Sequence, residues 1–234
     1  MINVKSIHAV NPLATLAVVA GLSAWFATAG VAQSVGGQAY GTYVNTPAAS
    51  LGQSPLAVLP AVSGTDGDIA FAEADASGVP GTLSTEFLNS TTSGALGTAE
   101  TGAQSTATAA AINILNGLIT ADGLVANAVS SRTASGAASN ANGSTFDNLV
   151  VAGVPVTSGD AAVDPNTNIT LPGVGYVVLN EQIPTGDGVT SSGMTVNMIH
   201  VFEQSPILGL LGQIIGYQTV GEIIVGSATS SVGP

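Results

Sequence analysis

Residues 195–204, with the sequence TVNMIHVFEQ, show the alternation that decides the fold class of this chain. Successive side chains of a β-strand point to opposite faces, so every second residue shares a face. On this period one face carries Val196, Met198, His200 and Phe202, and the other carries Thr195, Asn197, Ile199, Val201 and Glu203. The stretch therefore predicts a strand that places one histidine among apolar neighbours.

Similar short alternations recur along the chain, separated by clusters of Gly, Pro, Asn, Asp and Ser that are typical of turns. They include STFDNLVVAGVPV (144–156), ITLPGVGYVVLNEQI (169–183) and EIIVGSATSSV (222–232). The alanine-rich stretch 107–131 would suit a helix, but its Gly, Ile, Val and Thr residues favour strands, and we predict β-structure there. Within 169–183, LPGVG reads as a Pro-Gly turn between two strands. The sequence predicts an all-β fold: a single antiparallel β-sandwich or jelly-roll-like domain that follows an N-terminal signal helix.

The composition excludes several classes of function. The 234 residues carry 14 acidic side chains but only Lys5 and Arg132 as basic ones, for a net charge of −12. A nucleic-acid partner is not expected, because phosphate binding needs Lys and Arg. The chain has no cysteine, so disulfides, thiolate metal sites and a cysteine nucleophile are excluded.

Residues 1–32 are expected to be a secretory signal peptide. Lys5 precedes an apolar stretch, LATLAVVAGLSAWFATAGVA (13–32), which ends in small residues suited to cleavage. The alternative is a retained membrane anchor, because the apolar stretch is long enough to span a bilayer. A secreted protein, extracellular or on the cell surface, is expected in either case.

The next segment, QSVGGQAYGTYVNT (33–46), is expected to be extended. It has two possible roles. It can be a donor strand that completes the sheet of another copy, or it can be the first strand of its own domain. Residues 47–234 are expected to form the β-rich surface domain.

The densest acidic cluster lies in SGTDGDIAFAEADASGVPG (63–81). Calcium prefers several hard oxygen ligands on a flexible loop, so this cluster is the best metal candidate. The alternative is an acidic, solvated turn. The predicted calcium ligands are Asp66, Asp68, Glu73 and Asp75; no other cofactor is expected.

No catalytic residue is predicted, and we do not expect an enzyme. His200 is the only histidine after residue 32, and a lone histidine on an apolar strand face is typically a hydrogen-bonded core residue. The stretch 205–226, SPILGLLGQIIGYQTVGEIIVG, is strongly apolar. It is expected to lie in the core, with contact to a membrane or a neighbouring subunit as the alternative.

Six motifs occur in an order that resembles the choice-of-anchor P family of bacterial surface proteins. They are GGQAYG, NILNGLITADGLVANAVSS, GSTFDNLVVAGVPV, NTNITLPGVGYVVLNEQ, MTVNMIHV and GEIIVGSA, between Gly37 and Ala228. The resemblance implies a surface protein without enzymatic activity, whose members differ in their C-terminal anchors. This sequence departs from that pattern, because it ends in SATSSVGP, which holds no sorting motif. Release, an uncleaved N-terminus or binding to other molecules is therefore expected.

The sequence as a whole predicts a secreted bacterial structural protein that assembles into a fibre, surface layer or biofilm matrix by β-strand addition. A homo-oligomer or filament is expected, with contact to envelope or surface polysaccharide. The alternative is an adhesin or a ligand- or carbohydrate-binding module, stabilised by calcium. Its weakness is the scarcity of aromatic rings, which do most of the work in sugar stacking.

Overall fold

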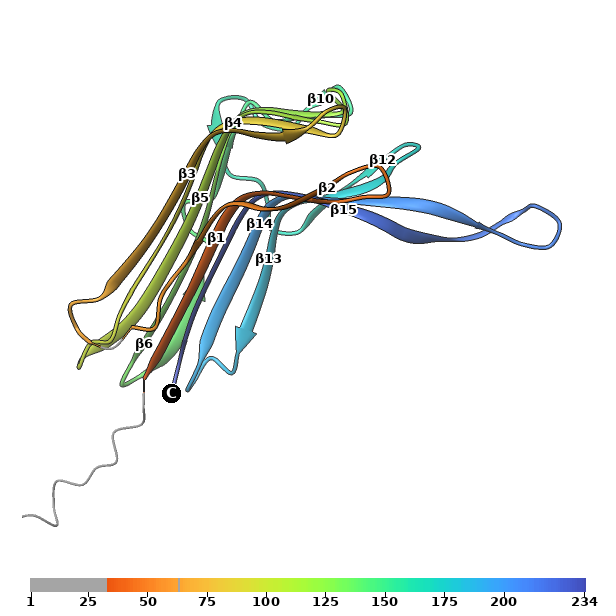
Figure 1. The fold of residues 1–234 in the computed structure, drawn as a ribbon. Coiled ribbons are helices and arrows are strands. Elements are labelled where there is room, and N and C mark those ends of the chain that lie inside the picture. The colour runs from red at the N-terminus through yellow and green to blue at the C-terminus, as the bar shows by residue number, and fades with distance from the viewer. Residues whose placement is uncertain (1–32, 63) are drawn as a thin grey trace, which may run out of the picture. The chain divides into compact units, whose positions relative to one another are not determined.

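Fifteen β-strands in two antiparallel sheets make up the part of the chain that the structure describes (Figure 1). The computed structural model describes residues 33–62 and 64–234, so the predicted signal peptide and signal helix lie outside the described residues. No helix occurs within those ranges. In chain order the strands are β1 (Ser34–Asn45), β2 (Ser50–Val58), β3 (Asp68–Val79), β4 (Leu83–Ala95), β5 (Glu100–Ile114), β6 (Ile119–Thr133), β7 (Gly136–Asn140), β8 (Thr145–Asp147), β9 (Val150–Val151), β10 (Val154–Pro155), β11 (Asp160–Ala161), β12 (Thr167–Leu171), β13 (Gly175–Gly186), β14 (Ser192–Leu208) and β15 (Ile214–Gly233).

The two sheets face each other as a β-sandwich, which confirms the predicted fold class. The six-stranded sheet has the order β12-β13-β14-β15-β1-β2. The nine-stranded sheet follows the path β10-β9-β6-β5-β4-β3, with β7 and β8 paired to β6 and β11 paired to β8. Sequence neighbours pair as hairpins in both sheets, and the pairing of β1 with β15 joins segments far apart in the chain.

The stretch 107–131 lies within the hairpin of β5 and β6, which confirms the predicted β-structure there. Its turn contains Leu115, Asn116 and Gly117, all with positive φ, and the Gly117 amide donates to Asn113 Oδ1 at 2.8 Å. The alanines do not form a helix here because every second one is needed in the core: Ala107 and Ala109 are buried. A small side chain at such positions lets the facing sheet approach closely.

The core between the sheets is partly polar. Several hydroxyls are fully buried and bond to each other in pairs, such as Thr92 with Ser105 at 2.8 Å and Ser130 with Ser230 at 2.8 Å. A buried hydroxyl is tolerated when it finds a partner, and these pairs supply one for each. Many Ser and Thr residues therefore serve in the interior and not only at the surface.

The LPGVG stretch is the turn between β12 and β13, as predicted. The Val174 amide donates to the Leu171 carbonyl at 3.0 Å, and Gly173 has a φ of 76°. Pro at the second position and a positive φ at the third are the features of a type II turn, which a glycine accommodates without strain.

The predicted donor segment is strand β1 of its own domain in this structure. It lies inside the six-stranded sheet and pairs with β15 on one side and β2 on the other. Of the two roles that the sequence left open for residues 33–46, the structure shows the first strand of the domain. Exchange of this strand between copies stays a prediction.

Long strands of both sheets turn part-way along their length (Figure 1). These strands contain residues in the left-handed region, with φ of 49° at Phe87, 49° at Ala111, 48° at Asn180 and 69° at Gly226. Such a residue in a strand marks a bulge, which interrupts the ladder and bends the strand. The strand pairing is indeed interrupted between Glu86 and Asn89.

The bulges also shift the alternation of β14, so the sequence-based assignment of its faces was wrong in one half. Met198 and Ile199 are adjacent and both fully buried in the core. Beyond that point Ile199 and Val201 continue the core face, whereas His200 and Phe202 lie on the outer face with Thr195 and Asn197. The histidine therefore lies outside the sandwich core, although it is buried.

Candidate functional site

A polar cluster lies on the outer face of the six-stranded sheet, on the inner side of its bend. We call Glu181, Asn197, His200, Glu222 and Ser227 the corner cluster. Glu181 comes from β13, Asn197 and His200 from β14, and the other two from β15. Only 8% of His200 and 2% of Ser227 are exposed, although both face away from the sandwich core. The bend of the sheet brings its outer face close to itself, which explains this burial.

The corner cluster is hydrogen-bonded throughout. Asn197 Nδ2 donates to Glu181 Oε2 at 2.7 Å, and the Ser227 hydroxyl donates to Asn197 Oδ1 at 2.7 Å. His200 Nδ1 lies 2.8 Å from the same Glu181 oxygen, and His200 Nε2 lies 3.4 Å from Glu222 Oε2. Buried polar groups with partners of this kind fix one geometry, because each lost bond leaves an unsatisfied group.

Local electrostatics favours the ionised form of Glu181. The hydrogen bond from His200 is the largest cause that lowers the pKa of Glu181 below 4.5, with burial acting against it and the Asn197 amide adding to it. Burial raises the pKa of the nearby Tyr40 phenol above 10.0.

The imidazole of His200 is held from three sides. It contacts two carboxylates through its nitrogens and packs on the Phe202 ring, with 3.9 Å between ring centroids. Phe202 in turn stacks on Tyr176 at 4.7 Å. His200 is therefore hydrogen-bonded as predicted, but it is not the sandwich-core residue that the sequence predicted. The prediction that the chain is not an enzyme stays a prediction.

The structure does not gather the predicted calcium ligands into one site. Asp66 lies before β3, Asp68 begins that strand, and Glu73 and Asp75 follow on it, all four exposed. Within residues 33–62 and 64–234, no three acidic or histidine side chains lie close enough to hold a metal ion. Calcium binding at this edge strand stays a prediction.

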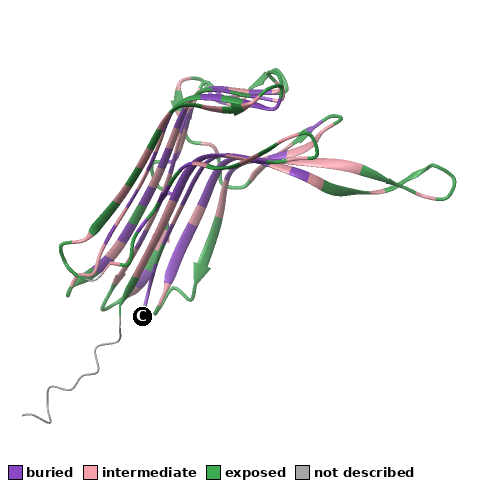
Figure 2. Ribbon diagram, in the orientation of Figure 1, coloured by how far each residue is buried: buried purple, intermediate pink, exposed green. Residues whose placement is uncertain are grey.

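A long apolar hairpin is the second notable region, and we call residues 204–221 the arm. Beyond Glu203 and Glu222, β14 and β15 continue as a two-stranded ribbon that projects past the other strands (Figure 1). Figure 2 shows the ribbon mostly exposed or half-buried. The expectation that residues 205–226 lie in the core was therefore wrong for the arm and right for the buried residues Ile223–Val225.

The tip of the arm exposes two leucines almost completely, Leu210 at 105% and Leu211 at 93%. The other exposed apolar residues of the arm are Ile207, Leu208, Ile214, Ile215 and Tyr217. No Asp, Glu, Lys or Arg occurs between residues 204 and 221. Contiguous exposed apolar surface of this kind is typical of an interaction site.

The arm has a fixed register and a closed turn. Pro206 pairs with Tyr217 and Leu208 with Ile214. At the tip the Gly209 amide donates to the Gln213 carbonyl at 2.8 Å, and Gly212 turns the chain with a φ of 79°. The apolar side chains are therefore presented by an ordered ribbon.

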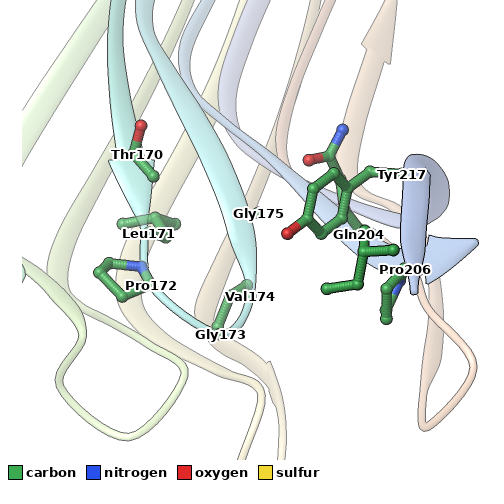
Figure 3. A pocket seen from close by; sticks show the side chains of 10 residues that line it. Thr170, Leu171, Pro172, Gly173, Val174, Gly175, Gln204, Pro206 and Tyr217 are labelled. Atoms are coloured by element: carbon green, nitrogen blue, oxygen red, sulfur yellow. The ribbon is translucent and has the colours of Figure 1, made fainter. Parts of the chain in front are cut away.

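A cleft of about 460 Å³ lies where the arm leaves the sheet, next to the LPGVG turn (Figure 3). The Gln204 amide donates to the Val174 carbonyl at 2.7 Å and ties the turn to the base of the arm. None of the lining residues carries a charge. They are Thr170, Leu171, Pro172, Gly173, Val174, Gly175, Gln204, Pro206, Ile214 and Tyr217.

Sequence reasoning missed the corner cluster because the strict alternation placed His200 on the face of Val196 and Met198, away from Asn197. In the structure Glu203 pairs with Gly175, and Glu181 pairs with Asn197. The sequence did contain one signal of the bulges: Asn180 and Gly226 lie inside otherwise regular strand patterns. These residue types tolerate the left-handed conformation and mark bulges.

Comparison with family models, curated proteins and solved structures gives no match for this chain. The resemblance to the choice-of-anchor P family therefore stays a prediction. Among the residues that the structure describes, no helix has the length and apolar character needed to cross a membrane.

Proposed function

We propose that this chain is a secreted bacterial cell-surface structural protein whose copies associate into a fibre, surface layer or matrix. The observation that carries the proposal is the arm, which holds Leu210 and Leu211 in solvent on an ordered ribbon. Burying one leucine side chain is favourable by about 1.5–3 kcal/mol. Association that covers the two exposed leucines is therefore favoured.

The charge distribution supports association at a confined place. The net charge of −12 makes copies repel one another over most of their surface. The arm and the cleft carry no charge, so contact there avoids the unfavourable approach of like charges. Such a distribution keeps the body of the protein soluble while one patch associates.

The sheet edges support the predicted route of β-strand addition. Strands β12 and β2 end the six-stranded sheet, and β10 and β3 end the main path of the nine-stranded sheet. Lysine is a common protection of exposed edges, and residues 33–234 contain none. Exchange of β1 between copies is a second form of the same route, since β1 lies between β2 and β15 and forms antiparallel backbone pairs with both.

Self-association is tested by electron microscopy and sedimentation velocity of the protein recovered from the producing cells and their medium. We expect assemblies that grow with protein concentration. Monomers at every concentration would contradict the proposed function.

Strand exchange needs a test that keeps β1, because deleting residues 33–46 removes a central strand of the sheet. Gln38 and Thr229 are directly opposite partners, and paired Cα atoms about 4.5–5.5 Å apart suit a disulfide. In a chain without other cysteines, Gln38→Cys with Thr229→Cys gives a monomer on a non-reducing gel when β1 stays in its own sheet. A ladder of cross-linked chains shows exchange, and a monomer band from assembled protein contradicts it.

A further inference from the structure

We propose that the tip of the arm of one copy binds in the cleft at the base of the arm of the next copy. This inference rests on the proposed self-association and names the two surfaces that meet. The tip is defined by Leu210 and Leu211, and the cleft by the LPGVG turn with Pro206, Ile214 and Tyr217.

The tip and the cleft match in size and chemistry. An apolar cavity of about 150 Å³ accommodates a benzene molecule, and the side chain of leucine has fewer carbons. A cleft of about 460 Å³ therefore has room for both leucine side chains. Its walls are mostly prolines, glycines, aliphatic side chains and one tyrosine, with Thr170 and Gln204 as polar members and no charge to be buried. Figure 3 shows Tyr217 and Pro206 on the arm side, opposite Leu171, Pro172 and Val174.

The tip cannot fill the cleft of its own chain. Leu208 pairs with Ile214, which itself lines the cleft, and the turn Gly209–Gln213 continues outward from that pair. Folding the tip back would break the ribbon whose register is fixed at Pro206 and Tyr217. The leucines that complement the cleft must therefore come from another molecule.

A second copy suits these surfaces better than a lipid surface does. Segments that bind anionic membranes typically combine apolar residues with Lys or Arg, and the arm has neither basic residue. The acidic body, with a net charge of −12, is repelled by anionic lipid. A second copy presents an uncharged, apolar cleft at the place where the tip arrives.

Contact between two different surfaces of the same chain has a consequence for assembly. An assembly built by this contact keeps a free tip at one end and a free cleft at the other. Copies can therefore be added without a built-in limit, unless the rotation from one copy to the next closes a ring. The two leucines alone do not offset the loss of free motion on binding, so the flanks of the arm, Ile207 and Ile215, are expected to join the contact.

The test uses one variant for each surface. Leu210→Ser with Leu211→Ser changes the tip, and Tyr217→Asp places a carboxylate in the cleft. The controls are Val154→Ser with Val189→Ser, and Phe71→Asp, because these residues are also apolar and exposed but lie outside the arm and the cleft. By sedimentation velocity we expect the tip variant to weaken self-association by about 100-fold or more, and the controls to associate like the wild type.

Mixing the two variants gives the decisive result. Each variant alone is expected to stay monomeric, while the mixture forms a dimer with one copy of each, because one intact tip meets one intact cleft. Assembly by both variants as in the wild type would overturn the inference, as would a tip variant that fails to associate while the cleft variant assembles normally.

Two further outcomes separate this inference from the proposed function. Wild-type assembly that survives in both variants, together with cross-linked ladders from the Gln38→Cys and Thr229→Cys pair, leaves strand exchange as the route and overturns arm docking. The second outcome is wild-type protein that stays monomeric but binds phosphatidylcholine vesicles in a flotation assay, while the tip variant does not bind them. That result overturns both proposals.

Discussion

Strands β14 and β15 contain two regions of opposite character, the arm and the part of the corner cluster other than Glu181. In the corner cluster, Asn197, His200 and Ser227 are polar and buried; in the arm, Leu210 and Leu211 are apolar and exposed. Both regions belong to the same pair of strands with one continuous ladder, interrupted by a few register shifts. The difference teaches that the polarity of a side chain did not decide its burial here. The bend of the sheet and the reach of the ribbon decided it.

The bend acts on the corner cluster by folding the outer face of the sheet toward itself. Glu181 lies on β13 and Glu222 on β15, the two strands that flank β14. Both can then approach His200, one from each side. The arm lies beyond the last strands that could cover it, so its side chains meet no second layer of their own chain. The predictions below test this contrast, from the largest expected effect to the smallest.

The largest effect is expected from Gly226→Ala at the bend. Gly226 has a φ of 69°, and a Cβ there would lie 2.3 Å from Leu124 Cδ1. Left-handed strain and overpacking together cost about 3–5 kcal/mol of the free energy of unfolding. The matched control is Gly216→Ala on the same strand in the arm, where the nearest atom would be 3.8 Å away. Urea unfolding followed by circular dichroism measures both, and equal losses would contradict the role of the bend.

Asn197→Ala is expected to cost about 2–3 kcal/mol, because it removes one of the two hydrogen bonds to Glu181 Oε2 and the Asn197 acceptor of the buried Ser227 hydroxyl. Gln218→Ala, an exposed amide of the arm, is the control and should change the free energy of unfolding by less than about 0.5 kcal/mol. A loss at Asn197 no larger than at Gln218 would show that the corner cluster does not stabilise the fold.

The pH dependence of stability should differ in sign between two glutamates of the six-stranded sheet, Glu181 on β13 and Glu203 on β14. The pKa of Glu181 is lowered in the folded state, so its contribution is present above pH 4.5 and is lost as pH falls through the folded value. Burial raises the pKa of Glu203, so its contribution is fully present below pH 4.5 and is lost as pH rises through its folded value.

Glu181→Gln should therefore lower the free energy of unfolding at pH 7, by about 1–2 kcal/mol, and the difference from the wild type should shrink as the pH falls below 4.5. Glu203→Gln should not lower it at pH 7. Urea unfolding between pH 3 and pH 7 measures both curves. If the free energy of unfolding of the two variants differed from that of the wild type by the same amount at every pH, the assigned pKa directions would be contradicted.

The tip variant, Leu210→Ser with Leu211→Ser, should change the free energy of unfolding of the monomer by no more than about 0.5 kcal/mol, since neither side chain is packed. The measurement is thermal unfolding at a concentration where the wild type is dissociated. A loss of several kcal/mol would mean that the tip is packed in the monomer and that the contrast with the corner cluster is wrong.

The smallest effect is expected from calcium at Asp66 and Asp68. Without a third acidic ligand close by, only weak binding is expected, and a ligand present at its own Kd stabilises by about 0.4 kcal/mol, or about 1–2 °C in Tm. Asp66→Asn with Asp68→Asn should remove this calcium-dependent rise in Tm. No effect of calcium on the wild type would refute the predicted site.

The sequence was sufficient to predict the strands and turns. Alternation in residues 195–204, the Pro-Gly turn at Pro172 and the Gly-interrupted hairpin at Gly117 are local signals, and local signals determine such elements. The all-β sandwich follows from their number and spacing.

The bend, the corner cluster and the arm could not be derived in the same way. The face of His200 depends on a one-residue shift at Met198 and Ile199, and such a shift moves every later side chain to the other face. The exposure of Leu210 depends on how far two strands extend past the rest of the sheet. Both are properties of the assembled sheet, to which the alternation of one strand contributes no information.

The central position of β15 also has a consequence for when the protein can fold. β15 lies between β14 and β1, and Ser34 Oγ donates at 3.1 Å to the carbonyl of Pro234, 200 positions along the chain. Contacts between such distant segments slow folding, because a long loop must close before they form. The six-stranded sheet cannot be completed until residues 214–233 have been synthesised, so a nascent chain lacks its central strand.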